Sequence, residues 1–140
     1  MARKKKTSKS RRLVMGLDSS TSCFGYSFLE ERTGELIDYG KIIPPLDPVK
    51  VESKAKNKKL DYLPRCDYLM NELEGIYESA PGKVVAIAIE QPNTVKNVDT
   101  TRKLCGLYGM TRYMFWIRYN IDCHEINTKH NKLHITTNGS

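Results

Sequence analysis

The sequence has no long apolar run and no paired-cysteine motif. No stretch of apolar residues reaches the roughly 18 that a membrane-spanning helix needs, and no hydrophobic signal segment opens the chain. The four cysteines are scattered without a C-x-x-C pair, which argues against a structural zinc site. We therefore expect an intracellular, cytoplasmic protein that is not secreted and keeps its thiols reduced.

The sequence also lacks internal repeats, and its 140 residues fit one domain with a core of its own. Its excess of positive charge is confined to one end. The net charge is +7, and seven basic residues lie within the first 12, so the other 16 basic residues balance the 16 acidic ones. We expect residues 1–12 to form a disordered basic arm that attracts the phosphates of a nucleic acid, or else a solubilising or targeting tail. The folded domain is then residues 13–140.

Three short segments near the start of the domain have the pattern of strands. Leu13–Asp18 is apolar and ends in an acid, and Gly25–Glu31 and Glu35–Ile43 follow after short polar turns. Connections this short predict an antiparallel meander, because a parallel partner needs a crossover of about a dozen residues or more. The Pro- and Lys-rich segment Pro44–Lys59 then predicts a loop.

The second half of the domain alternates helix and strand patterns. Apolar residues recur at helical spacing from Leu60 to Tyr77, with Pro64 in the first turn, and Pro81 with Gly82 stops the pattern. Val84–Glu90 is a strand that is apolar on both faces, which predicts helices on both sides of the sheet.

A second helix is predicted from a cap at Asp99 or Thr100 to about Asn120, and Ile121–Asn127 gives a last strand. Gly106 and Gly109 weaken this helix, so we expect them to allow close approach of another backbone, from the sheet or from a second subunit. The fold prediction is an α/β domain with a mixed five-stranded sheet, three strands antiparallel and then two parallel, with helices on both faces.

Two acids end apolar strands in this arrangement, Asp18 and Glu90. If the two strands are parallel neighbours, both carboxylates emerge at the edge where open α/β sheets place their sites. Two such carboxylates repel each other unless a cation lies between them, and Mg²⁺, with Mn²⁺ as a substitute, prefers such oxygen ligands. The alternative is that Asp18 caps the polar turn and Glu90 pairs with a lysine.

Two long segments carry a family resemblance. LVMGLDSSTSCFGYSFLEERTGELIDYGKI and AIAIEQPNTVKNVDTTRKLCGLYGMTRYMFWIRYNIDCHEINTKHNKLHITTNG resemble the RuvC-like Holliday junction resolvases. The matching features are an apolar strand ending in Asp, the E-Q pair, K-N-x-D, K-L-x-G-x-x-G and the closing N-G. They cover residues 13 to 139, with the least similarity between Pro44 and Gly82.

The resemblance implies an RNase H-like fold and a metal-dependent endonuclease of DNA recombination and repair. Such an enzyme cleaves Holliday junctions or other branched DNA by two-metal-ion hydrolysis. By this resemblance Asp18 contacts both metal ions and Glu90 binds one, and loss of either carboxylate removes cleavage but leaves DNA binding. Because a four-way junction has two-fold symmetry, the expected assembly is a homodimer.

The chain departs from the family at its end. The resolvases complete the site with two further acids on a C-terminal helix, whereas this sequence ends at Asn138, Gly139 and Ser140 with no acid after Glu125. The expectation is a C-terminally incomplete nuclease domain or, alternatively, a module that binds branched DNA without cutting it. Asp122 and Glu125 are possible replacement ligands, but a solvated strand residue is the favoured interpretation of each.

Basic and polar residues shortly after Glu90 are the predicted DNA contacts, namely Lys96, Asn97, Arg102 and Lys103. The alternative is a solvated loop and helix start. The family often has an aromatic residue just after the Glu that stacks on an unpaired base, but here the segment is PNTV. A second cluster, Lys50 to Lys59, either contacts DNA or is solvated. Aromatic residues of the second helix predict core or dimer packing.

Two other enzyme classes share single features. Nucleotide-binding domains of the actin and sugar-kinase type also have a strand ending in Asp before a polar turn, but they need a second lobe that 140 residues do not provide. A small RNase H-like ribonuclease acting on ribosomal RNA precursors fits the length better. The match from Lys96 to Asp99 favours the resolvase.

Overall fold

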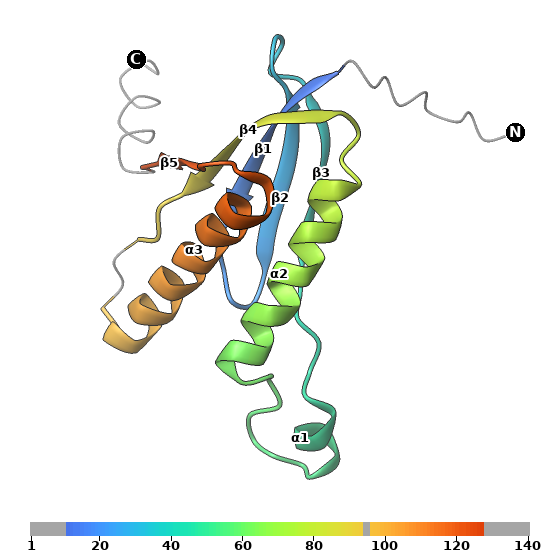
Figure 1. Ribbon diagram of the computed structural model, residues 1–140. Helices are drawn as coiled ribbons and strands as arrows, with labels where there is room; N and C mark the ends of the chain where they lie inside the picture. The colour runs from blue at the N-terminus through green and yellow to red at the C-terminus, as the bar shows by residue number, and fades with distance from the viewer. Residues whose placement is uncertain (1–10, 94–95, 128–140) are drawn as a thin grey trace, which may run out of the picture.

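The computed structural model describes residues 11–93 and 96–127, which form one mixed sheet with helices packed on it (Figure 1). Five strands build the sheet in the order β3-β2-β1-β4-β5: β1 (Arg12–Asp18), β2 (Phe24–Glu30), β3 (Leu36–Ile42), β4 (Lys83–Glu90) and β5 (His124–Ile126). Three helices connect them: α1 (Pro48–Glu52), α2 (Tyr62–Glu78) and α3 (Val98–Tyr119).

The strand pairing matches the predicted meander and crossovers. β1 pairs with β2, and β2 with β3, in antiparallel ladders, whereas β4 lies parallel to β1 and β5 parallel to β4. The parallel pairs follow from the two crossovers through α2 and α3, which return the chain to the edge where each previous strand began. The predicted five-stranded mixed α/β sheet is thus confirmed.

The core lies between the sheet and the two long helices. Leu13, Met15 and Leu17 of β1 alternate with half-buried residues and are each less than 5% exposed, and Ile87 and Ile89 of β4 are fully buried beside them. They pack with buried residues of both helices: Cys66, Leu69, Leu73, Leu107, Met114 and Phe115. One face of the central strands therefore carries the hydrophobic stabilisation.

Within residues 11–93 and 96–127 both long helices lie on that same face (Figure 1). The predicted helical cover of the second face is not found in this part of the chain. Val84, Val85 and Ala86 made β4 resemble a strand buried on both sides, yet in the structure they are half-buried. Small and β-branched residues satisfy strand packing on a partly open face as well as in a core, so the sequence pattern did not separate the two cases.

Most strand and helix bounds differ from the predictions by one or two residues, and the larger differences are the following. Arg12 begins β1 rather than closing the basic arm, and its guanidinium bonds to Glu31 at 2.5 Å; residues 1–10 of the predicted arm lie outside the described residues. The predicted loop from Pro44 contains the short helix α1. The cap of α3 is Asn97, whose side chain accepts from the backbone of Asp99 at 2.9 Å, and β5 is shorter than predicted.

Gly106 allows the close approach of a side chain rather than of a backbone. The Tyr62 hydroxyl of α2 donates a hydrogen bond to the carbonyl of Lys103 at 2.6 Å. A Cβ at Gly106 would lie 2.5 Å from that hydroxyl, so the glycine permits the contact between α2 and α3. Burial of the Tyr62 ring raises the pKa of its hydroxyl to about 12. In the described residues Gly109 faces open space.

A bilayer span requires a long apolar helix. In the described ranges the structure contains none that meets this requirement.

Candidate metal and nucleic-acid site

Asp18 and Glu90 end the two central parallel strands. Leu17 of β1 pairs with Ile89 of β4 as the last residues of the ladder, and Asp18 and Glu90 are the next residues of the two strands. In a parallel ladder paired residues share a face, so the two carboxylates leave the sheet on the same side. The structure therefore brings together the two acids that the sequence singled out.

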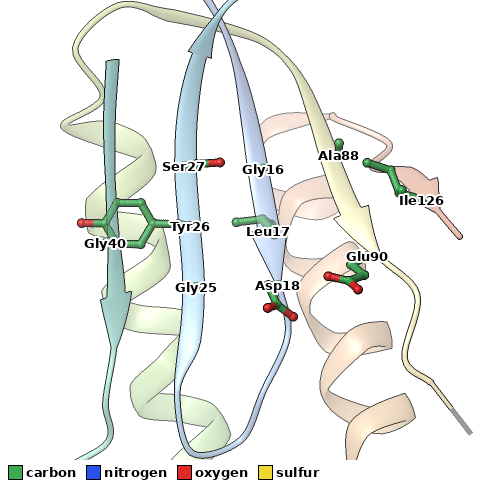
Figure 2. A pocket seen from close by; sticks show the side chains of 10 residues that line it. All are labelled: Gly16, Leu17, Asp18, Gly25, Tyr26, Ser27, Gly40, Ala88, Glu90 and Ile126. Atoms are coloured by element: carbon green, nitrogen blue, oxygen red, sulfur yellow. The ribbon is translucent and has the colours of Figure 1, made fainter. Parts of the chain in front are cut away.

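Both carboxylates line a hollow on the face of the sheet away from the two long helices (Figure 2). The hollow has a volume of about 420 Å³, and its lining includes Gly16, Asp18, Gly25, Ser27, Ala88 and Glu90. Small residues form its floor: Gly16 and Ala88 lie two residues before the acids on their strands, and Ser27 pairs with Gly16. A backbone or a phosphate could thus approach the sheet closely beside the carboxylates.

The close packing of β1 on β2 explains why position 16 is a glycine. A Cβ at this position would lie 2.7 Å from the Ser27 hydroxyl oxygen of the neighbouring strand. Neither Gly16 nor Ser27 is among the predicted site residues. The signal was available in principle, since a glycine inside a strand two residues before an acid marks a close approach on the face of that acid.

The two carboxylates suit one hard divalent cation. Mg²⁺ is commonly bound through one or two carboxylates, with water and phosphate oxygens completing its octahedral shell. Asp18 is exposed and Glu90 half-buried, so their oxygens are accessible from the hollow. Across residues 11–93 and 96–127 no group of three or more His, Cys, Asp or Glu side chains could hold a metal. A pair of ions would need ligands beyond these two.

Glu125, weighed as a replacement ligand, has other partners. Its carboxylate accepts from Arg112 of α3 at 2.6 Å and from the Gln91 side chain at 3.2 Å, and Arg112 also contacts Asp122 at 3.2 Å. The Gln91 backbone N–H donates to the Ile126 carbonyl at 2.9 Å. Glu125 therefore fastens β5 and α3 to the end of β4, next to Glu90.

The electrostatics of this network hold Glu125 in its charged form. The Tyr108 hydroxyl is buried, and no partner in the described residues meets the geometric criteria of a hydrogen bond to it. Its proximity to Glu125 is nevertheless the largest cause that lowers the pKa of the Glu125 carboxyl. Gln91 and then Arg112 lower this pKa further, against desolvation. Burial, together with Glu125, raises the pKa of Tyr108.

The predicted DNA contacts gather around the start of α3. Asn97 uses its side-chain oxygen as the helix cap, and Lys103 forms an ion pair with Asp99 at 3.0 Å one turn along the helix. Lys96 and Arg102 are exposed. Since α3 follows β4 after a short connection, this group lies toward the carboxyl-end edge of the sheet (Figure 1).

Comparison with known proteins yields similarity in structure alone. The sequence matches no protein family and no curated protein. Among solved structures, Thermus thermophilus RuvC in complex with a Holliday junction substrate is similar, with a TM-score of 0.61 and 12% identity over 83% of this chain and 64% of that one. A second structure of Thermus thermophilus RuvC gives a TM-score of 0.56 and 13% identity over 82% and 63%.

These values establish a shared architecture and nothing finer. Proteins with identity this low can have different activities on one fold. The chain spans slightly less than two thirds of the RuvC chains it matches. The five-stranded mixed sheet described above has an RNase H-like α/β fold that resembles RuvC.

Proposed function

We propose that this protein is a metal-dependent endonuclease that cleaves Holliday junctions or other branched DNA. The observation that carries the proposal is the pair Asp18 and Glu90, which line one hollow at the ends of the two parallel strands of an RNase H-like sheet. RuvC, which shares the fold, has been solved with a Holliday junction substrate.

Asp18 and Glu90 would hold the metal, which when bound supplies a lowered water pKa and neutralises charge on the scissile phosphate. The chain contributes rigid placement of the two carboxylates. Glu90 is fixed by its pairing with Ile126 of β5 and by the neighbouring Gln91, which bonds to both the backbone and a side chain of β5. Small residues such as Gly16 leave room for the phosphate in the hollow.

The basic residues around the start of α3 would position the DNA. Lys96, Arg102 and Lys103 offer positive charge for phosphates, and Asn97 offers its side-chain amide while its oxygen caps the helix. Phosphate contacts of this kind fix the register of DNA without reading its sequence. Basic residues of the amino-terminal arm, including Arg3 and Lys4, would add a salt-dependent attraction.

We also propose a homodimer whose interface includes one face of α3. Tyr113, Trp116 and Ile117 are each more than half exposed, and their spacing places them together on the helix. Three large apolar side chains side by side are typical of an interaction surface. A two-fold partner there would match the symmetry of a four-way junction.

A module that binds branched DNA without cutting it is the second candidate. It is favoured by the lack of a third acidic ligand near Asp18 and Glu90 in the described residues. Glu125, the acid on β5, is held by Arg112 and Gln91.

A cleavage assay decides between the two. The full chain is incubated with Mg²⁺ or Mn²⁺ and with four-way, flap and linear DNA of equal length, and binding is measured in parallel by electrophoretic mobility shift. The endonuclease is expected to nick the branched substrates only, in a metal-dependent way. Binding to the junction without any nick in either metal would establish the binding module instead.

A further inference from the structure

A second hollow lies at the same edge of the sheet, beyond the loop that follows Asp18. Its volume is about 150 Å³, and its lining includes Thr21, Ser22, Pro44, Pro45, Leu60 and Arg65. Thr21 and Ser22 belong to the connection from β1 to β2, which begins directly after Asp18. This connection therefore links the second hollow to the end of β1 that carries Asp18.

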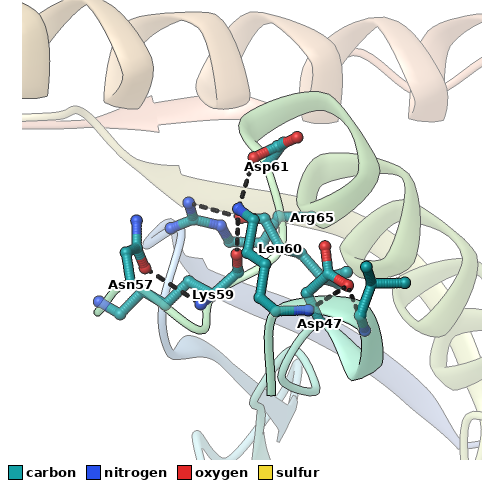
Figure 3. Close-up of polar contacts among 8 residues, drawn as sticks. Asp47, Asn57, Lys59, Leu60, Asp61 and Arg65 are labelled. Carbon is teal, nitrogen blue, oxygen red and sulfur yellow. Dashed lines mark hydrogen bonds and ion pairs between the residues drawn. The ribbon is translucent and has the colours of Figure 1, made fainter. Parts of the chain in front are cut away.

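Hydrogen bonds hold one wall of the hollow in place. Leu46 and Lys59 form an antiparallel bridge, and the Asp47 backbone N–H donates to the Lys58 carbonyl at 2.8 Å. The Lys50 ammonium bonds to the Lys59 carbonyl at 2.8 Å and to Asp61 at 2.6 Å (Figure 3). These contacts fold α1 back on the start of α2.

The loop on the other side is also fixed. The Ser20 hydroxyl accepts from the backbone N–H groups of Ser22 and Cys23, each at 3.3 Å. Thr21 and Ser22 of this turn line the hollow, and the Ser22 hydroxyl lies 3.3 Å from the Ser20 hydroxyl. Both walls are thus held by hydrogen bonds before any ligand arrives, which lowers the entropic cost of binding.

Arg65 gives the hollow its charge. One guanidinium nitrogen donates to the Leu60 carbonyl at 3.0 Å, as Figure 3 shows, while Nε is buried and has no hydrogen-bond partner in the described residues. Lys59 also lines the hollow, and Lys54, Lys56 and Lys58 are exposed in the adjoining loop. Because Arg65 lines the hollow, its positive charge favours a ligand that supplies an anionic acceptor.

The remaining lining is apolar. Pro44, Pro45 and Leu60 form much of it, and Ile43 and Leu46 at the same site are each more than half exposed. Apolar surface next to a guanidinium and two hydroxyls matches the two parts of a nucleotide, a flat base or sugar and an anionic phosphate. A small inorganic anion would leave the apolar part unused.

We infer that this second hollow binds one unpaired nucleotide of a DNA strand, with Arg65, Thr21 and Ser22 contacting its phosphate and the prolines and Leu60 its base or sugar. The inference rests on the proposed function, because the DNA strand bound in this hollow is the one that also reaches Asp18 and Glu90. The hollow would hold a strand that leaves the branch point and so give preference to branched over fully paired DNA.

The test measures binding to a single strand without divalent metal. The full chain in EDTA is titrated with an oligothymidylate of about 12 nucleotides, a length within the usual range of single-strand sites. Amide resonances of Thr21, Ser22 and Leu60 are expected to shift on titration. Arg65→Gln should weaken the affinity about tenfold or more, since it removes hydrogen bonds from a cation to a phosphate.

Matched variants separate loss of the contact from loss of the fold. Arg32→Gln removes the same charge in the turn between β2 and β3. This turn lies at the opposite ends of the strands from the hollow, so the substitution should leave the affinity within about twofold. Arg65→Lys should recover part of the affinity, and Thr21→Val, on a separate segment, should weaken it. Equal weakening by Arg65→Gln and Arg32→Gln, or no weakening by Arg65→Gln, would overturn the inference.

Inorganic phosphate is the second probe. If phosphate alone shifts the three amides as strongly as the oligonucleotide at equal phosphate concentration, the hollow is an anion site and the nucleotide inference fails. Because the assay contains no metal, its outcome is independent of cleavage. Loss of binding at the hollow in a protein that still nicks junctions would refute this inference alone, and intact binding in a protein that never nicks would refute only the proposed activity.

Discussion

Leu17 and Ile89 are the last paired residues of the parallel ladder between β1 and β4. The carboxylates of Asp18 and Glu90 therefore leave the sheet beside each other and line one hollow, as Figure 2 shows. Their relative position is set by backbone pairing rather than by flexible loops. Sites placed on paired strands are held more precisely than sites on loops.

Neutralising either carboxylate is expected to remove metal-dependent cleavage. Asp18→Asn and Glu90→Gln keep the size of each side chain but lose the charge that binds Mg²⁺. We expect the cleavage rate on a four-way junction to fall at least about a hundredfold in each variant. Junction affinity in EDTA should change less than about threefold, because phosphate contacts from basic residues supply most of it.

Asp38→Asn is the matched control, since Asp38 is an exposed acid on β3 of the same sheet, away from the hollow. It should cleave at the wild-type rate. Calorimetric titration with Mg²⁺ provides a readout apart from activity, and the binding heat should be lost with Asp18→Asn and kept with Asp38→Asn. Undiminished cleavage by both active-site variants would refute the assignment of these carboxylates.

The site residues that could be predicted from the sequence are those whose position depends on one strand alone. Asp18 and Glu90 each end an apolar run, and a charge at such a place costs free energy unless a partner compensates it. By contrast, the contact of Arg112 with Glu125 depends on how α3 returns to the sheet. No local pattern encodes that geometry, so Glu125 could only be weighed as a possible ligand.

The same distinction applies to the fold. Helix periodicity around Leu69 and Leu73 placed α2 correctly because its buried positions recur at the helical repeat. The cap of α3 was misassigned since Asn97, Asp99 and Thr100 are all residue types that cap helices, and only the backbone conformation of Asn97 decides among them. Cover on both faces was predicted from the composition of β4, which does not report burial directly.

A methyl group at Gly16 should be coupled energetically to Ser27. Gly16→Ala places a Cβ 2.7 Å from the Ser27 hydroxyl oxygen unless that side chain moves. We expect the substitution to be less favourable by about 1 kcal/mol in the wild-type background than in a Ser27→Ala background. Urea unfolding of the two single variants, the double variant and the wild type gives this coupling energy. Equal effects in both backgrounds would contradict the close contact.

The stability contributed by Glu125 should depend on pH. Proximity of the Tyr108 hydroxyl, then Gln91, lowers the pKa of Glu125 in the folded protein. Its contribution is thus fully present above the unfolded pKa of about 4.3 and is lost as the pH falls through the lower folded value. Because this side chain is 37% exposed, Glu125→Gln should cost less than about 1 kcal/mol at pH 7.

Urea unfolding of the wild type and of Glu125→Gln between pH 7 and about pH 3 checks the sign of this effect. The difference between the two proteins should shrink only below about pH 4.3. In a Tyr108→Phe background the largest cause of the shift is removed, so the decline should begin at a higher pH. A difference that grows as the pH falls would contradict the lowered pKa of Glu125.

The exposed face of α3 should control the assembly state. Trp116 lies between Tyr113 and Ile117 on that face, and all three are more than half exposed. We expect the wild-type chain to sediment as a dimer at micromolar concentration and Trp116→Glu to weaken the dimer at least about thirtyfold, because a buried charge replaces a large aromatic contact. Tyr39→Glu is the control, since Tyr39 is similarly exposed but lies on the edge strand β3. If both glutamates weaken the dimer equally, the interface lies elsewhere or includes both surfaces. If the wild type is a monomer, the proposed dimer is wrong, and a symmetric cut of both junction strands must come from two separate encounters with the DNA.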